Sequence, residues 1–249
     1  QPSEFFKLFY IIWLCAYLDT NKKNIESVKI FMIPVVVFSI SSLLLLLQPD
    51  FGSTVIIFLI TFIMLYIARA KIIHLLTLLL FGSLNATILI LLSEERLSRF
   101  NFFEPCSNYG GDGYHLCWSL MAIGSGGVFG KGLGASTTKL SYLPEAHTDF
   151  IFAILAEELG IFGVIFTIIL FYLFIKKCFF IGDKSFRLGL IFQGYLSYAI
   201  GIFISLQAFL NMSVNIGIVP TKGLALPFFS YGGSNYLVSI LSIAIILRI

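Results

Sequence analysis

The stretch SYLPEAHTDFIFAILAEELG, residues 141–160, joins ionisable side chains to an apolar run. Asp149 directly precedes the run, and Glu145 and His147 lie just before it. A carboxylate at the first turn of a helix could act as a general base. It could also cap the helix, because aspartate suits that position and the positive end of the helix dipole. On residue types alone the cap is the favoured interpretation. His147 is expected to make an orienting hydrogen bond, with metal binding as the alternative.

Two adjacent glutamates, Glu157 and Glu158, interrupt the same apolar run. Eight helical residues would separate Glu157 from Asp149 by about 12 Å along the axis. A charge near the bilayer centre costs about 2.5–3.5 kcal/mol on insertion scales, so such residues normally face the interior and find a partner. We expect both glutamates to shape a cavity, as ion pairs or protonated carboxyls, rather than to perform the chemistry.

Other charged residues lie near further helix ends. Lys7 follows Glu4 by three residues, so it could pair with that acid or reach a phosphate group. QPDFGS (48–53) repeats the Gln-Pro-acid pattern of QPSE (1–4). The pattern fits two membrane-edge turns, or two acids, Asp50 and Glu4, that line one outward cavity.

The glycine-rich stretch GSGGVFGKGLGASTTK, residues 124–139, contains Lys131 and Lys139. It is not a nucleotide phosphate loop, because Gly132 follows Lys131 where Ser or Thr is required. A flexible turn is the favoured interpretation, and a backbone nest for a lipid diphosphate is the alternative.

The cysteines offer no metal-ligand spacing such as paired CxxC motifs. Cys106 and Cys117 share one predicted outer loop, where oxidising conditions would permit a disulfide. Two unpaired thiols are the favoured interpretation.

These residues must be positioned by a membrane-embedded framework. The 249 residues are 58% hydrophobic and 12% charged, with a mean hydropathy of +0.97, whereas soluble domains carry about 25% charged residues. The apolar runs predict helices, because open strands cannot satisfy their backbone groups in lipid. We expect an all-α, polytopic membrane helix bundle that forms one integral domain over 1–249. Its seven spans are predicted at 4–18, 28–47, 53–68, 72–92, 150–175, 188–210 and 236–249.

The charges between these runs predict an orientation. If the runs alternate, ten of the sixteen Lys and Arg residues fall on one side. The positive-inside rule makes that side cytoplasmic, with connectors at 19–27, 69–71 and 176–187. The large loop 93–149 and the connector 211–235 then face outward, and long loops of this kind are usually functional. Within the large loop, residues 113–123 predict an interfacial helix.

The motifs resemble one known family. LPEAHTDFIFAILAEELG (143–160) and PTKGLALPFFSYGGSN (220–235) look like signatures of the SEDS family, named for shape, elongation, division and sporulation. QPSEFFKL, QPDFGS and GYHLCWSLMAIGSGGVFGKGLG match further family blocks in the same order. PEAHTDFIFA with PTKGL is closest to the division-type FtsW branch. The resemblance implies ten spans, of which this chain is similar to the last seven. We therefore expect a fragment, which agrees with the missing initial Met and the short final run.

The resemblance also implies an activity. The family polymerises peptidoglycan strands from lipid II, a disaccharide-pentapeptide on undecaprenyl diphosphate, at the outer face of the bacterial cytoplasmic membrane. Asp149 matches the family's essential aspartate, while Lys7 and Asp50 match residues associated with its active cavity. The expected substrate-binding residues are Lys7, Asp50, Lys131, Lys139, His147 and Glu145. Glu157, Glu158 and Lys222 are expected to shape the cavity.

The hypothesis is that Asp149 removes the proton from the acceptor sugar hydroxyl, which attacks the donor's anomeric carbon. The leaving diphosphate needs cations, and a divalent ion, Mg²⁺ or Mn²⁺, is the only candidate cofactor. Expected partners are a class B penicillin-binding protein transpeptidase and other divisome membrane proteins at the septum, with no nucleic acid. A lipid II flippase or transporter that uses Glu157 and Glu158 is the first alternative. A seven-helix receptor, suggested by the segment count, is the second.

Overall fold

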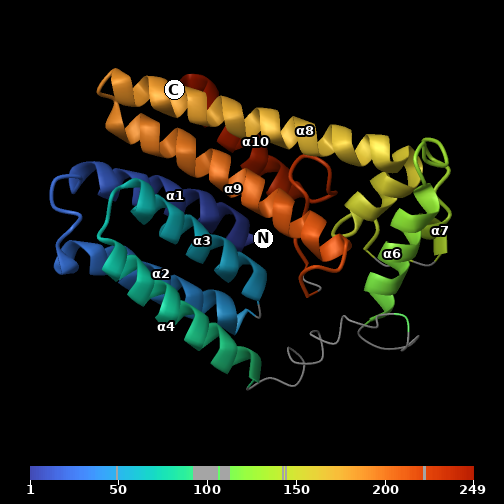
Figure 1. Cartoon of the computed structure of the whole chain (residues 1–249), viewed down its shortest axis with the longest axis horizontal. Coiled ribbons are helices and arrows are strands. Elements are labelled where there is room, and N and C mark those ends of the chain that lie inside the picture. The colour runs from blue at the N-terminus through green and yellow to red at the C-terminus, as the bar shows by residue number, and fades with distance from the viewer. Residues whose placement is uncertain (49, 92–105, 107–112, 142, 144, 221–222) are drawn as a thin grey trace. The chain divides into compact units, whose positions relative to one another are not determined.

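The computed structural model describes the chain except for residues 49, 92–105, 107–112, 142, 144 and 221–222. Every regular element in this described part is a helix, as the apolar runs predict (Figure 1). In chain order the helices are α1 (Pro2–Thr20), α2 (Val28–Leu47), α3 (Phe51–Ile67), α4 (Ile72–Leu91), α6 (Tyr114–Gly126), α7 (Thr138–Ser141), α8 (Ile151–Arg187), α9 (Ile191–Asn215) and α10 (Gly233–Arg248). The all-α class is confirmed, and α6 is the helix predicted at 113–123.

Each of the seven apolar runs coincides with a helix, but several helices extend past the apolar residues. The run predicted to end at residue 175 continues as α8 to Arg187. Gly189 follows with a φ of 79°, and a glycine in the left-handed region commonly terminates a helix. By length and composition α2, α8 and α9 could each cross a membrane. That all seven helices do so stays a prediction.

The chain divides into two compact units. The first contains residues 1–87, 174–204 and 237–249, and the second contains residues 88–173 and 205–236. Helices α4, α8, α9 and α10 therefore contribute residues to both units.

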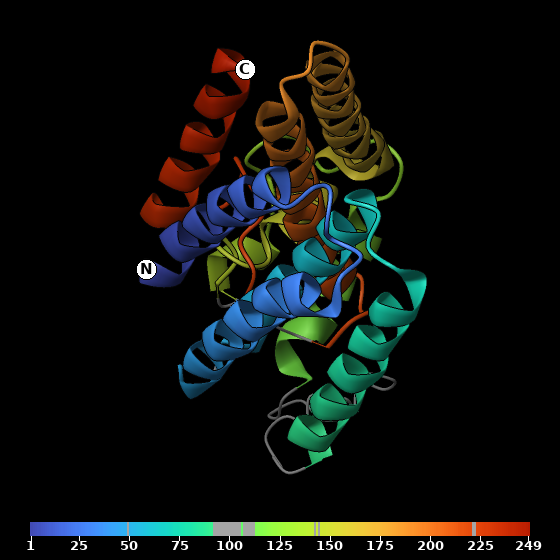
Figure 2. The ribbon, with the colours of Figure 1, turned by 90° about the vertical axis from the view of Figure 1, so that its left-hand side faces the viewer.

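In the first unit α3 packs against α1 and α2 (Figure 2). The hydroxyls of Tyr10 on α1 and Thr61 on α3 share a hydrogen bond of 2.6 Å. The rings of Phe38 on α2 and Phe58 on α3 have centroids 5.6 Å apart. One buried polar pair and one aromatic pair thus join α3 to its two neighbours.

The second unit is built around the start of α8. A small core there is formed by Ala122, Leu143, Ala146, Phe150, Ala153 and Ile154. Cys106 and Cys117 form a disulfide, with their Cα atoms 5.1 Å apart, that joins Cys106 to α6. The interpretation that left these thiols unpaired is therefore wrong. Sequence spacing alone could not reveal that the two cysteines meet in space.

A break in α8 shapes the rest of this unit. Gly160 has φ 66° and ψ −162°, so the helical hydrogen bonds across it cannot form. The carbonyls of Glu157 and Glu158 instead accept from the backbone N–H groups of Lys131 and Gly132, each at 3.0 Å. The freed N–H groups of Ile161 and Phe162 donate to carbonyls of Gly127 and Val128. The loop thus supplies the partners that buried backbone groups require.

We expect Gly160→Ala to destabilise the protein, because a non-glycine residue in this backbone region costs about 1–3 kcal/mol. A Cβ atom at Gly160 would also collide with the backbone of Val128 and Gly130. The measurement is the thermal unfolding midpoint of the purified protein in detergent. Gly124→Ala is the control, since Gly124 lies in α6 and a Cβ atom there would meet nothing within 4 Å. Equal midpoints for the two variants would contradict this role of the break.

Candidate active site

Asp149 lies in the turn that leads into α8, and it does not cap that helix. The side chain of Asn215 takes this role, because its Oδ1 accepts from the backbone N–H of Ala153 at 3.2 Å. Within the described residues, no backbone N–H of α8 donates to the Asp149 carboxylate. Asp50 behaves differently: its Oδ1 accepts from the N–H of Ser53 at 2.9 Å and caps α3. The capping alternative thus describes Asp50 rather than Asp149.

The Asp149 carboxyl group is half-buried and close to another acid. Burial, together with the charge of Glu145, raises its pKa from 3.8 to about 6. Gly223 approaches so closely that a Cβ atom there would lie 2.9 Å from Oδ2 of Asp149. A carboxyl group with such a pKa can exchange a proton near neutral pH, which is what general acid–base chemistry requires.

The connector after α9, which is distant in sequence, contacts this turn. The hydroxyl of Ser230 donates to the carbonyl of Thr148 at 2.6 Å and accepts from the backbone N–H of Leu226 at 2.6 Å. The backbone N–H of Tyr231 donates to the carbonyl of His147 at 2.9 Å. The connector after α9 is therefore fastened along the turn that carries Asp149.

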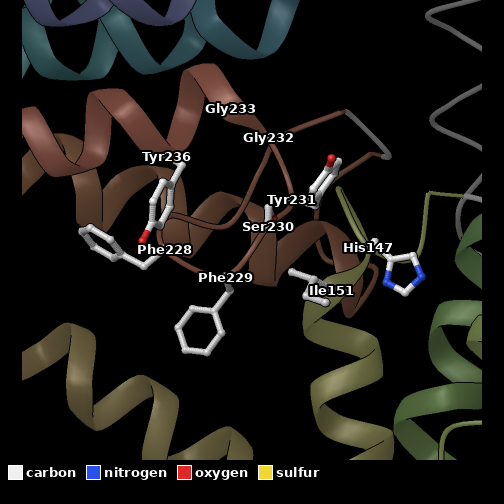
Figure 3. A pocket seen from close by; sticks show the side chains of 9 residues that line it. All are labelled: His147, Ile151, Phe228, Phe229, Ser230, Tyr231, Gly232, Gly233 and Tyr236. Atoms are coloured by element: carbon white, nitrogen blue, oxygen red, sulfur yellow. The ribbon is translucent and has the colours of Figure 1, made fainter. Parts of the chain in front are cut away.

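A cavity of about 590 Å³ opens beside the same turn (Figure 3). Its lining comes from the turn, the connector and α10: His147, Ile151, Phe228, Phe229, Ser230, Tyr231, Gly232, Gly233 and Tyr236. The exposed His147 ring lies on its rim, and four aromatic rings supply much of its wall. Asp149 is not a lining residue, but it lies in sequence between His147 and Ile151. The cavity suits a ligand with a large apolar portion.

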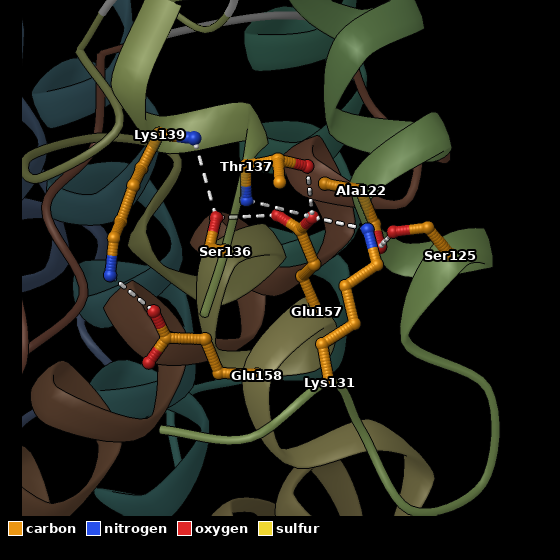
Figure 4. A network of polar contacts seen from close by, with 8 residues as sticks. All are labelled: Ala122, Ser125, Lys131, Ser136, Thr137, Lys139, Glu157 and Glu158. Carbon is orange, nitrogen blue, oxygen red and sulfur yellow. Dashed lines mark hydrogen bonds and ion pairs between the residues drawn. The ribbon is translucent and has the colours of Figure 1, made fainter. Parts of the chain in front are cut away.

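Glu157 and Glu158 hold the glycine-rich loop (Figure 4). The Glu157 carboxylate is fully buried and accepts from Lys131 Nζ at 2.7 Å and from the Ser136 hydroxyl at 2.5 Å. The Glu158 carboxylate accepts from Lys139 Nζ at 2.5 Å. Both glutamates are thus in ion pairs, one of the two states expected. The substrate-binding roles of the two lysines stay predictions.

Lys7 and Asp50 belong to the first unit. The Lys7 side chain is fully buried, and its Nζ lies 2.6 Å from Glu4 Oε1 and 5.7 Å from the centre of the Phe203 ring. The structure therefore pairs Lys7 with the acid three residues earlier. Lys222 lies outside the described residues. The roles of Lys7, Asp50 and Lys222 at a cavity stay predictions.

In the described part of the chain, no three His, Cys, Asp or Glu side chains gather to hold a metal ion. The divalent cation stays a prediction.

Sequence reasoning missed a set of polar residues on α9, two of which bind the turn that carries Asp149. Gln207, Asn211 and Asn215 recur every fourth residue in a mostly apolar helix, which puts them on one face. Asn211 and Asn215 both donate to the carbonyl of Asp149, at 2.8 and 3.0 Å. The four-residue spacing of amides was the available signal.

The family model of the cell cycle proteins FtsW, RodA and SpoVE matches residues 1–249. The chain belongs to this family. The resemblance drawn from the motifs is therefore confirmed, and the seven-helix receptor is excluded.

Curated relatives support the same assignment. The chain is 44% identical over 250 residues to the probable peptidoglycan glycosyltransferase FtsW of Nitrosococcus halophilus, covering 100% of this chain and 65% of that protein. It is 42% identical over 253 residues to the FtsW of Thioalkalivibrio sulfidiphilus, with coverage of 100% and 63%. The chain thus spans slightly less than two thirds of the length of these relatives.

Two solved structures have a similar fold. One is a chain from work on the structural coordination of polymerization and crosslinking by a peptidoglycan synthase complex, with a TM-score of 0.74, 24% identity, and coverage of 100% of this chain and 69% of that one. The other is the rod shape determining protein RodA of Thermus thermophilus, with a TM-score of 0.66, 24% identity, and coverage of 99% and 64%. With the family match, they make this chain part of a multi-pass membrane protein.

We expect Glu157→Leu to release the glycine-rich loop, because it leaves Lys131, Ser136 and the loop backbone without their acceptor. A buried donor such as the Ser136 hydroxyl that is left without its acceptor typically costs about 1–3 kcal/mol. The measurements are the unfolding midpoint and the rate of tryptic cleavage after Lys131 and Lys139.

Glu158→Leu serves as the graded comparison, because the Glu158 carboxylate accepts from fewer loop groups, the Lys139 Nζ and the backbone N–H of Gly134. Cleavage should accelerate more in Glu157→Leu. Slower or equal cleavage in that variant would refute the anchoring role of Glu157.

Proposed function

We propose that the protein is a peptidoglycan glycosyltransferase of the division-type branch, which polymerises lipid II at the outer face of the bacterial cytoplasmic membrane. The observation that carries the proposal is Asp149, a half-buried carboxyl group with a raised pKa that is spared from helix capping. The sequence identity to proteins named probable peptidoglycan glycosyltransferase FtsW supports the reaction class.

In this proposal Asp149 accepts the proton of the acceptor sugar hydroxyl while the hydroxyl oxygen bonds to the donor's anomeric carbon. The bond from that carbon to undecaprenyl diphosphate breaks, and the diphosphate leaves with the electron pair. General-base assistance is typically worth 10²–10⁴-fold in rate. The Asp149 carboxylate can serve this purpose only when it is ionised and has no competing hydrogen-bond donor.

Cationic groups would stabilise the leaving diphosphate. The Lys131 side chain is 34% exposed and has two further N–H donors besides the one that binds Glu157, so it could bind a phosphate oxygen. Lys139 or a divalent ion, Mg²⁺ or Mn²⁺, could add further positive charge. The aromatic cavity beside His147 would accept isoprenoid units of the lipid carrier.

The proposed location and partners follow from the same reaction. The positive-inside pattern supports an outward-facing Asp149. A class B penicillin-binding protein transpeptidase would crosslink the new strands, and other divisome membrane proteins would bring the enzyme to the septum. The similarity of fold to a chain of a peptidoglycan synthase complex supports such an assembly.

A lipid II flippase was the competing interpretation, because buried glutamates can carry protons in transporters. The contacts of Glu157 and Glu158 argue against it. Each carboxylate is held by a lysine and by further donors of the glycine-rich loop, so neither is available to a transported headgroup.

We expect Asp149→Asn to reduce glycan polymerisation by roughly 10²–10⁴-fold, because the amide cannot accept the hydroxyl proton. The measurement is polymer formation from lipid II by the full-length protein purified with its transpeptidase partner. Asp19→Asn, an acid of the first unit, is the control. Unchanged polymerisation in Asp149→Asn would refute the catalytic role. Lost lipid II translocation with intact polymerisation would favour the transporter.

The rate should also depend on pH through Asp149. Because the base must be ionised, activity should fall as the pH drops through about 6 and level off above it. Glu145→Gln removes the neighbouring negative charge and should move this acidic limb to lower pH. Burial is the larger cause of the raised pKa, so the limb should stay above pH 3.8. An unmoved limb in Glu145→Gln would assign the titration to another group.

A further inference from the structure

We propose that Asn211 and Asn215 of α9 are positioning residues for Asp149, a role that rests on the function proposed above. The two carboxamides fix the backbone of Asp149, cap α8 in its place and hold the connector against its carboxylate. Neither asparagine touches the reacting atoms in this proposal. They act through Asp149 alone.

Asn211 joins the turn to the connector with a single amide group. Its Nδ2 donates to the carbonyl of Asp149 at 2.8 Å and to the carbonyl of Leu224 at 2.5 Å. Both N–H bonds of that nitrogen are therefore used. Leu224 follows Gly223, whose backbone closely approaches the Asp149 carboxylate. Asn211 thus sets the spacing between the carboxyl group and this wall.

Asn215 binds the same turn one helical turn further along. Its Nδ2 donates to the Asp149 carbonyl at 3.0 Å, and its Oδ1 accepts from the N–H of Ala153 at 3.2 Å. Its own backbone carbonyl accepts from the Ser119 hydroxyl on α6 at 2.8 Å. The residue therefore connects α6, α8 and α9 around Asp149.

The arrangement explains how the Asp149 carboxylate stays available at the start of a helix. The first N–H groups of a helix need acceptors, and an aspartate just ahead of it would normally supply one. Asn215 supplies it from another helix instead. Asn211 and Asn215 are 1% and 0% exposed, so these hydrogen bonds have no competition from water. A rigid support of this kind is what a catalytic group needs.

Gln207 provides a matched comparison. It lies one turn before Asn211 on α9, is equally buried at 1%, and donates to the connector carbonyl of Ala225 at 3.2 Å. Its other hydrogen bond, at 3.0 Å, goes to Asn235 Oδ1 rather than to the turn that carries Asp149. A residue that serves only the fold should resemble Gln207, whereas a positioning residue should not.

The experiment compares Asn211→Leu with Gln207→Leu in the full-length protein purified with its partner, using lipid II polymerisation. Both variants should lower the unfolding midpoint by similar amounts. Per folded molecule, only Asn211→Leu should lower kcat, by roughly 10- to 100-fold, with KM within about two-fold of the original value. Equal kcat values for the two variants would overturn the proposal.

Asn215→Asp keeps the test decisive if Asn211→Leu does not fold. An aspartate can still accept from Ala153, so α8 stays capped, but its ionised form cannot donate to the Asp149 carbonyl. We expect a lowered midpoint, because the new charge is fully buried, and, per folded molecule, a kcat lowered roughly 10-fold or more. An undiminished kcat would overturn the proposal. If Asp149→Asn itself retains activity, the proposed function fails instead, which the same assay reveals.

Discussion

Buried backbone groups must be hydrogen-bonded, and α8 takes partners from other segments at two places, its start and its break at Gly160. At the start, the N–H of Ala153 donates to Asn215 on α9 as well as to the Phe150 carbonyl. The loop around Lys131 satisfies the break, with two N–H donors and two carbonyl acceptors. These two sets of hydrogen bonds join α9 and the glycine-rich loop to the short helical segment that follows Asp149. The second unit is built around that segment.

The raised pKa of Asp149 is consistent with a helix start that is bound by Asn215 rather than by Asp149. An aspartate ahead of a helix is usually committed to the helix dipole and its free N–H groups, which stabilise the ionised form and lower its pKa. Here another residue makes that contact, so burial and the nearby Glu145 act without opposition and raise the pKa to about 6. The carboxylate is left weakly solvated and available, which is the state that the proposed general-base role requires.

The buried glutamates illustrate how charge alone can mislead. Glu157 and Glu158 stand in an apolar run, where ionisable residues are commonly functional. The break at Gly160 places the glycine-rich loop alongside them, and Lys131 and Lys139 neutralise them. These contacts show both carboxylates holding the glycine-rich loop in place. Asp149 instead lies in the turn beside the cavity and the connector, where burial and a second acid act on its charge.

Local composition and contiguous motifs were enough to predict the seven helices, the membrane setting and the family, and they singled out Asp149 as a candidate. Apolar runs did not mark every helix end, since α8 continues beyond its apolar residues to Arg187, just before Gly189. The folded structure was needed to show which acid caps a helix and that Cys106 forms a disulfide with Cys117. It was also needed to show that Asn211 and Asn215 donate hydrogen bonds to the Asp149 carbonyl. Those choices join residues far apart in the chain, and their energies depend on the folded distance between partners, which no local pattern encodes.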